Sequence, residues 1–183
     1  MKHYIEVTLL PNKDIPENCL LNKTYTCLHK QLYDMKSSEI GVSFPHYQVK
    51  LGNTIRIHGN AGELKKFEDG EWLDKLKLDC LISEINPVPE SVMYRVVSRV
   101  QPTMSMSKLR RLINRGSISE EDIKNYKAKM FSKGLELPYL ELDSVSNGHK
   151  HRRYINFGEL KTEPSFGSFD FFGLSNTATI PWF

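Results

Sequence analysis

Hydrophobic and polar residues at the start of the chain follow first the period of a strand and then that of a helix. Residues 3–10 alternate and are rich in isoleucine, valine and tyrosine, which predicts a strand that ends at Pro11. A helix is expected to begin after Pro16, with apolar residues at helical spacing: Leu21, Tyr25, Leu28, Leu32 and Met35. Because this apolar stripe must pack on another element, we expect the helix to cover a sheet.

The same patterning continues to residue 86. The predicted elements are strands at 40–44, 54–58 and 80–86, a strand fragment at 49–51, and a helix at 63–76 interrupted near Gly70. Their order is strand, helix, strand, strand, helix, strand. This is the ferredoxin-like (RRM-like) βαββαβ arrangement, which many RNA-binding modules share. A fold alone does not establish a function.

A proline-containing stretch at residues 87–89 marks the point where the composition becomes basic. We expect a domain boundary there, with domains at 1–88 and 89–183. The second domain is predicted to hold a strand at 94–101, helices at about 105–115 and from 117 onwards, and strands at 139–142, 151–157, 168–174 and 179–183. Serine followed by acidic residues at 117–121 suits a helix N-terminus. The predicted fold class is therefore α+β in both domains.

The composition is that of a folded protein. Charged residues make up 26% of the 183 residues and hydrophobic ones 39%, which argues against disorder. No apolar run approaches the ~20 residues of a membrane span, and the N-terminus lacks the layout of a signal peptide, so a cytoplasmic location is expected. Cys19, Cys27 and Cys80 include no close pair, which suggests neither a disulfide framework nor a zinc site.

The net charge of +3 is mild but unevenly distributed. Between residues 94 and 116 the chain has no acidic residue and carries Arg95, Arg99, Lys108, Arg110, Arg111 and Arg115. Such a segment favours a polyanionic partner. Two alternatives stay open. One is a helix face that only contacts solvent. The other is a DNA-reading helix, because Leu109 and Leu112 occupy one side of the helix and leave the arginines on the opposite side.

The sequence lacks the usual ingredients of a metal-dependent nuclease. It has no His-Asp pair, no Asp-x-Asp motif and no Cys/His cluster at ligand spacing, so neither a metal nor a cofactor is expected. RNA supplies its own nucleophile in the 2′-hydroxyl. One histidine with a few hydroxyl or cationic groups can therefore catalyse its cleavage.

His29 is the strongest candidate for that histidine. It follows Leu28 and lies one turn after Tyr25, at the edge of the apolar stripe, where packing would hold the imidazole while its tip reaches the surface. The alternative is a half-buried structural histidine. The claims of His46, His58 and His3 are weaker, because they lie in predicted turns or strands without nearby chemistry.

A hydroxyl cluster in the second domain is the other candidate feature. Ser144 and Ser146 lie in a turn-like stretch that ends at Gly148 and leads into a basic run. Taken alone, this stretch also fits an ordinary polar hairpin.

A series of short, ordered matches with near-constant spacing is more specific than any of these signals. The matches are His3-Tyr4, Leu28-His29, residues 40–45, Arg56-Ile57-His58, residues 98–101, Leu109-Arg110-Arg111, Ser144-x-Ser146-x-Gly148, Gly173-Leu174-Ser175 and Pro181-Trp182-Phe183. Through them the chain resembles the CRISPR-associated repeat endoribonuclease of subtype I-F systems, the Csy-four type, along nearly its whole length.

The resemblance implies a ferredoxin-like N-terminal domain and a second domain whose arginine-rich helix enters the major groove of a CRISPR repeat RNA hairpin. It further implies cleavage at the 3′ base of the stem, which leaves a 2′,3′-cyclic phosphate and a 5′-hydroxyl. The product would then be retained by the protein as a subunit of a type I-F effector complex, a Cascade-like assembly. A non-catalytic subunit that caps the RNA is the main alternative, and a DNA-binding regulator is the third.

The resemblance also implies roles for individual residues. His29 would be the catalytic imidazole, Ser144 would orient the 2′-nucleophile and Ser146 would assist. Arg99 and Gln101 would read purine edges at the foot of the stem, as the arginine fork can do at guanine O6 and N7. The further RNA-binding residues would be Lys108, Arg110, Arg111, Arg115 and His151.

Two positions depart from the family pattern. Phe172 stands where the better-known relative has a tyrosine; its ring can still stack on His29 but cannot donate a hydrogen bond, so a required phenol is not expected. His151 stands where that relative stacks a phenylalanine under the terminal base pair. A histidine can also stack, but it adds a titratable group. The helix has fewer arginines as well, which implies a lower affinity.

Overall fold

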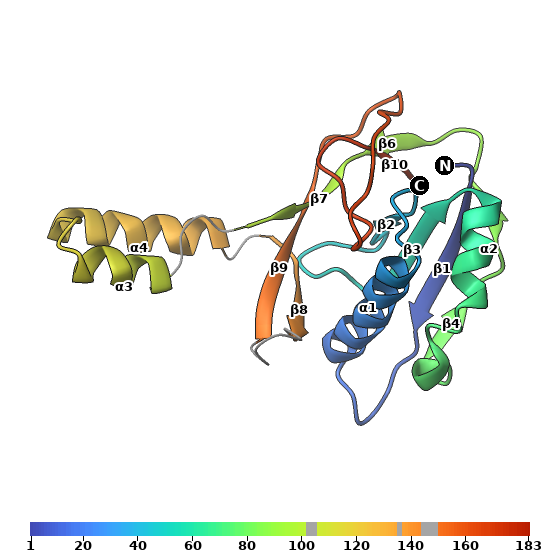
Figure 1. Ribbon diagram of the computed structural model, residues 1–183, viewed down its shortest axis with the longest axis horizontal. Helices are drawn as coiled ribbons and strands as arrows, with labels where there is room; N and C mark the ends of the chain where they lie inside the picture. Colours follow the sequence, from blue (N-terminus) through green and yellow to red (C-terminus); the bar gives the residue numbers. More distant parts are fainter. Residues whose placement is uncertain (102–105, 135–136, 144–149) are drawn as a thin grey trace.

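The computed structural model describes residues 1–101, 106–134, 137–143 and 150–183. Within these ranges four α-helices combine with antiparallel sheets, so the fold is mixed α and β (Figure 1). The first half of the chain contains β1 (His3–Leu9), α1 (Glu17–Asp34), β2 (Gly41–Ser43), β3 (Thr54–Gly59), α2 (Ala61–Asp69), a short 3-10 helix (Asp74–Leu76), β4 (Cys80–Ile82) and β5 (Asn86–Pro87). None of the described helices is long and apolar enough to cross a membrane.

The strands of the first half form one antiparallel sheet in the order β2-β3-β1-β4, with β5 paired to the other end of β1. Helices α1 and α2 cover this sheet (Figure 1). The predicted stripe of α1 is confirmed, because Leu21, Tyr25, Leu28 and Leu32 are all buried in the core. Met35 packs against the edge of the same cluster.

The second half supplies two further small sheets. Its elements are β6 (Met93–Arg95), β7 (Val97–Val100), α3 (Met106–Asn114), α4 (Glu120–Gly134), β8 (Tyr139–Asp143), β9 (Lys150–Phe157) and β10 (Ile180–Trp182). Strand β6 pairs with β10, while β7, β9 and β8 form an antiparallel sheet in that order. Val97, Leu140 and Ile155 from this half join the same hydrophobic core as α1.

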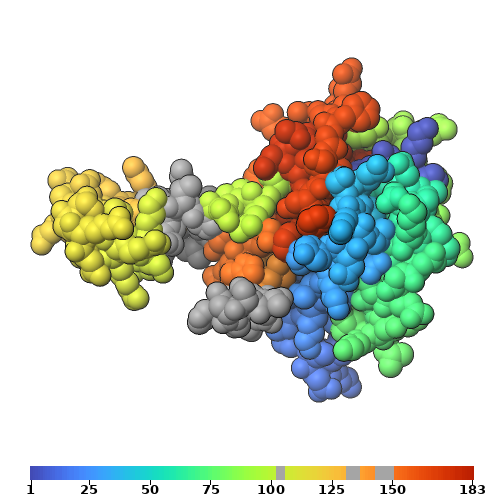
Figure 2. Space-filling model, viewed as in Figure 1, coloured from blue at the N-terminus to red at the C-terminus, as the bar shows by residue number. Residues whose placement is uncertain are grey.

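Helices α3 and α4 project from the body of the molecule as a separate lobe (Figures 1 and 2). The predicted cap of the second helix is confirmed, since the Ser119 hydroxyl oxygen accepts the N–H of Asp122 at 3.1 Å. Asp122 and the two glutamates before it lie in the first turn of α4, where the helix dipole favours negative charge.

Several predicted boundaries were wrong. For the helix expected at 63–76, the interruption predicted near Gly70 is confirmed, because α2 ends at Asp69 and Glu71 adopts a φ of 48°. The helix begins at Ala61, however, and beyond the interruption only the 3-10 turn forms. Residues 49–51 form no strand; Gly52 has a φ of 79° and the chain bends there. The strands expected at 80–86 and 94–101 are each divided in two.

The strand predicted at 168–174 is also wrong. Asp170 Oδ1 accepts the backbone N–H groups of Phe172 and Leu174, both at 2.9 Å, which closes a tight turn. Gly173 has a φ of 69°, a conformation incompatible with an extended strand. Phe169 and Leu174 on either side of the turn are buried, whereas Phe171 is exposed.

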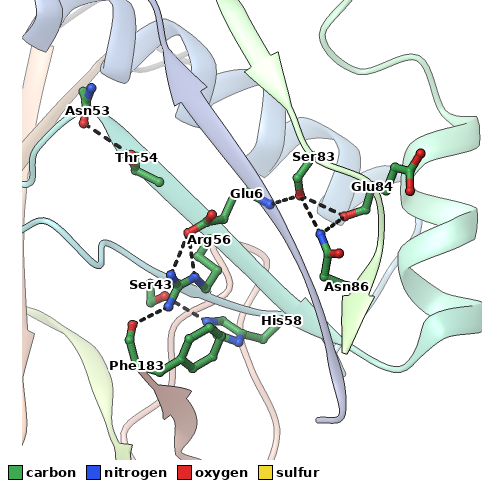
Figure 3. Close-up of polar contacts among 10 residues, drawn as sticks. All are labelled: Glu6, Ser43, Asn53, Thr54, Arg56, His58, Ser83, Glu84, Asn86 and Phe183. Carbon is green, nitrogen blue, oxygen red and sulfur yellow. Dashed lines mark hydrogen bonds and ion pairs between the residues drawn. The ribbon is translucent and has the colours of Figure 1, made fainter. Parts of the chain in front are cut away.

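A polar network anchors the C-terminus to the first sheet (Figure 3). Arg56 donates two hydrogen bonds to Glu6 Oε1, at 2.9 and 2.6 Å, and a third to the Phe183 carbonyl oxygen at 2.6 Å. Nearby, His58 Nε2 lies 2.9 Å from the Ser43 hydroxyl, and burial lowers the pKa of His58 to about 3. His58 is therefore a neutral core histidine, in keeping with its weak catalytic claim.

Candidate active site

His29 lies on the flank of α1, half-buried, at the edge of the apolar stripe. Its Nδ1 is 2.7 Å from the carbonyl oxygen of Phe171. Because a carbonyl can only accept, Nδ1 carries the proton in this contact, and in the neutral imidazole the lone pair resides on Nε2. Nε2 forms no hydrogen bond within the described part of the chain. The imidazole is thus held in the tautomer that can accept a proton at Nε2.

The plane of the imidazole is set by Phe172. The two rings stack with centroids 3.6 Å apart and planes 9° from parallel. The Arg153 guanidinium carbon lies 3.4 Å from the centroid of the same phenyl ring. Two groups this close to one centroid must occupy opposite faces of the ring. His29, Phe172 and Arg153 therefore form a three-layer stack, which we call the His29 stack.

The backbone of Phe172 is fixed from two sides. The Tyr25 hydroxyl donates to the Phe172 carbonyl oxygen at 2.6 Å, and burial raises the pKa of Tyr25 far above its ordinary value, so the phenol stays protonated as a donor. Val42 on β2 donates to the Gly173 carbonyl at 2.8 Å. A Cβ on Gly173 would lie 2.3 Å from Val42 Cγ2, so only glycine lets the turn approach β2 this closely.

The C-terminal segment that contains Phe172 and Gly173 also forms one wall of an open groove of about 580 Å³. Arg99 and Gln101, both exposed, line it together with Ser168, Phe169, Asp170 and residues 174–177. The Ser175 N–H donates to the Val97 carbonyl at 3.0 Å, which holds the segment against β7. Burial and then the charge of Arg99 lower the pKa of Arg153, so the groove and the His29 stack are electrostatic neighbours.

Other predicted residues lie elsewhere. Ser144 and Ser146 fall outside the described residues. His151 is exposed on β9, paired with Leu142 of β8.

Helix α3 lies in the projecting lobe (Figure 1). Leu109 is its one residue classed as buried, while the basic side chains are exposed: Lys108, Arg110, Arg111 and Arg115. Arg95 differs from them, because it donates to the Gly158 carbonyl at 2.7 Å and lies 4.6 Å from the Trp182 ring. Arg95 is thus a structural residue, and the candidate binding surface begins at Arg99.

In the parts of the chain that the structure describes, no three histidine, cysteine or carboxylate side chains lie together as metal ligands do.

Comparison with known proteins identifies the family. The family described as "CRISPR-associated protein (Cas_Csy4)" matches residues 4–183. A CRISPR-associated endonuclease Cas6/Csy4 of Escherichia coli (strain UTI89 / UPEC) is 37% identical over 184 residues, covering 100% of both chains. A second one, from Pseudomonas aeruginosa (strain UCBPP-PA14), is 34% identical over 187 residues, again covering 100% of both.

The chain belongs to the Cas_Csy4 family. Endonuclease activity follows from this membership, because the relatives that carry that name align over their full length.

Three residues of the site were missed in the sequence. Asp170 and Gly173 form a turn signal that could have been found, since Asp-x-x-Gly is typical of a turn closed by an aspartate side chain. Arg153 sits in a basic run and looks like a surface residue. Only the alternation of β9 could have indicated otherwise, because it puts Arg153 and Ile155 on the buried side.

Proposed function

We propose that this Cas_Csy4 member cleaves CRISPR repeat RNA at the 3′ base of its hairpin, without a metal ion, to make mature crRNA. The observation that carries the proposal is the His29 geometry. Its Nδ1 proton is committed to the Phe171 carbonyl and its plane to Phe172, which leaves Nε2 as an oriented proton acceptor.

The proposed reaction uses the substrate's own nucleophile. His29 Nε2 takes the proton of the 2′-hydroxyl as its oxygen attacks the adjacent phosphorus. The bond from phosphorus to the 5′-oxygen breaks, and that oxygen takes a proton from water. The products are a 2′,3′-cyclic phosphate and a 5′-hydroxyl. Ser144 orients the 2′-hydroxyl, Ser146 assists, and Phe172 contributes a ring face without a proton to donate.

Recognition is proposed to involve two surfaces. Arg99 and Gln101, on the open groove beside the His29 stack, read purine edges at the foot of the stem. His151, exposed on β9, stacks under the terminal base pair. The exposed basic side chains on α3 and directly after it enter the major groove of the stem and contact phosphates or base edges: Lys108, Arg110 and Arg111 on the helix, and Arg115 after it.

The proposed architecture has two domains, 1–88 and 89–183. The sheet order β2-β3-β1-β4 with two covering helices supports a ferredoxin-like (RRM-like) first domain. The exposed basic face of α3 supports an arginine-rich helix in the second.

The protein is further proposed to keep its product and to serve as a subunit of a type I-F effector complex. Because the proposed substrate is a transcript, we expect this activity in the bacterial cytoplasm. The competing function is a capping subunit that binds the same hairpin without cutting it.

The test is incubation of the purified protein with repeat RNA in EDTA, beside the same RNA with a 2′-deoxy nucleotide at the cut site. The proposal requires cleavage of the first substrate and none of the second. Binding without cleavage would favour the capping subunit. Cutting of the 2′-deoxy RNA would instead indicate attack by water, and equal binding of a DNA duplex of the same sequence would favour a DNA-binding regulator.

A further inference from the structure

Arg153 is a buried arginine in an unusual environment. It is 4% exposed and lies on β9 next to Arg152, which points the other way. Strand alternation explains the difference, since successive side chains face opposite sides of a sheet. Arg152 is exposed and lies over the Tyr139 ring at 4.5 Å, whereas Arg153 faces inward over Phe172.

The burial of Arg153 is not compensated by an ion pair with any residue the structure describes. Its guanidinium forms no hydrogen bond with the described residues, and its Nε is buried without a partner. Burial and then the charge of Arg99 lower the pKa of Arg153, while the charges of Tyr25 and Asp170 oppose this to a smaller extent. Desolvating a cation in this way is costly. Among the described residues, the contact that offsets this desolvation cost is the face of the Phe172 ring, whose quadrupole attracts a cation.

We propose that Arg153 is the positioning residue of the His29 stack. Its guanidinium holds the phenyl ring of Phe172 in one plane, and the ring in turn holds the imidazole. This inference rests on the catalytic role proposed for His29.

A positioning residue is needed because the hydrogen bonds at the site fix the backbone of Phe172 and not the plane of its ring. Tyr25 and Asp170 hold the backbone of Phe172, and neither hydrogen-bonds its side chain. The ring carries no hydroxyl that could fix its orientation. A planar guanidinium at 3.4 Å restricts the ring plane in a way that a lysine ammonium does not. The Phe171 hydrogen bond then sets the direction of the imidazole within that plane.

The inference is tested with three single variants. Arg153→Met keeps length and apolar character but removes the charge and the planar group, and Arg153→Lys keeps the charge alone. Arg152→Met is the matched control, because it removes a stacked arginine from the neighbouring position of the same strand. The measurements are the single-turnover cleavage rate with protein in excess, hairpin affinity, and the position of the His29 Cε1–H resonance, which the stacked phenyl ring shields.

Arg153→Met is expected to slow cleavage about tenfold, the loss appropriate to one buried cation–π contact. Its hairpin affinity should change by less than the rate does. The His29 resonance should lose part of its shielding. Arg153→Lys should fall between Arg153→Met and the wild type, and Arg152→Met should leave both the rate and the resonance unchanged.

A double-mutant cycle tests whether the effect passes through the ring. In a Phe172→Leu background, Arg153→Met should change the rate by less than about twofold, because the contact it removes is already gone. An equal loss in both backgrounds would show that Arg153 acts by another route. If Arg153→Met fails to fold, Arg153→Lys and its cycle with Phe172→Leu decide the matter.

A wild-type rate together with an unshifted His29 resonance in Arg153→Met would overturn the inference. So would an equal loss in Arg152→Met. His29→Ala is measured in parallel to separate the two proposals. If His29→Ala cleaves normally, the proposed chemistry fails. If His29→Ala is inactive while Arg153→Met behaves as wild type, the chemistry stands and only the positioning role fails.

Discussion

Single residues decide the chemistry proposed for this site. Phe172 offers a ring face to His29, while Ser144 is proposed to offer a hydroxyl to the reacting group. We therefore expect Ser144→Ala to slow single-turnover cleavage more than Phe172→Tyr changes it. Single-turnover rates on the same repeat RNA check this. Equal or reversed effects would mean that the two roles are assigned incorrectly.

Gly173 links the His29 stack to the first sheet. Its φ of 69° and the 2.3 Å approach of Val42 Cγ2 leave no room for a side chain. Gly173→Ala should lower the free energy of unfolding by roughly 1–3 kcal/mol and slow cleavage, because the turn carrying Phe172 must move. Gly62→Ala is the control, since a Cβ there meets nothing within 4 Å and alanine favours the helix. Urea denaturation of both variants measures the difference; equal stability would contradict this account.

At the residue scale the sequence predicts some positions well and others not at all. His29 was predicted to lie at the edge of the α1 stripe, and it does, because helical spacing fixes which side of a helix faces the core. Arg153 could not be singled out by its charge. Its burial depends on the partner it meets, Phe172, which lies far along the chain and reaches it only through the tertiary fold.

Among the elements, α3 gives the sharpest prediction. If Arg110, Arg111 and Arg115 contact phosphates, replacing each should weaken hairpin binding. The slope of the logarithm of the binding constant against the logarithm of salt concentration should become shallower by roughly 0.7–0.9 per lost contact. Replacing Gln101 should hardly change this slope. It should instead reduce discrimination between bases at the foot of the stem, by about 1–3 kcal/mol for a good bidentate contact. Lys65→Ala on the exposed side of α2 is the control for simple loss of charge. Unchanged slopes for all three arginine variants would show that the face is merely solvated.

Elements with strong periodicity were predicted, and those governed by a turn were not. Helices α1, α3 and α4 lie close to their expected positions because their apolar spacing and caps are local signals. The strand expected at 168–174 is a turn instead, since one aspartate and one glycine outweigh the β propensity of the phenylalanines around them. The end of α2 was predicted, because Gly70 is a local signal that interrupts a helix, and α2 ends at Asp69.

The molecule as a whole presents two separate surfaces to its proposed substrate. The His29 stack and its groove belong to the body of the molecule. The basic face of α3 belongs to the lobe of α3 and α4, which projects from the body (Figure 1). A hairpin held at both places should dissociate slowly. We therefore expect about one product per protein when substrate is in excess. Product formation over time measures this, and rapid multiple turnover would contradict it.

The order of elements was readable from the sequence, but their assembly was not. Val97 and Ile155 share a core with Leu28, and the Phe183 carbonyl is bound by Arg56, which lies on β3. These contacts join distant parts of the chain and leave no periodic signal. The position of the candidate site, where α1 meets a C-terminal turn, depends on them.

The most direct test of the central claim is a comparison of cleavage and binding in His29→Ala. Because the imidazole is proposed to act on the 2′-hydroxyl proton and not on the stem, this variant should lose cleavage in EDTA while its hairpin affinity stays close to that of the wild type. Single-turnover cleavage and equilibrium binding on the same repeat RNA measure the two quantities. A cleavage rate like that of the wild type would contradict the account.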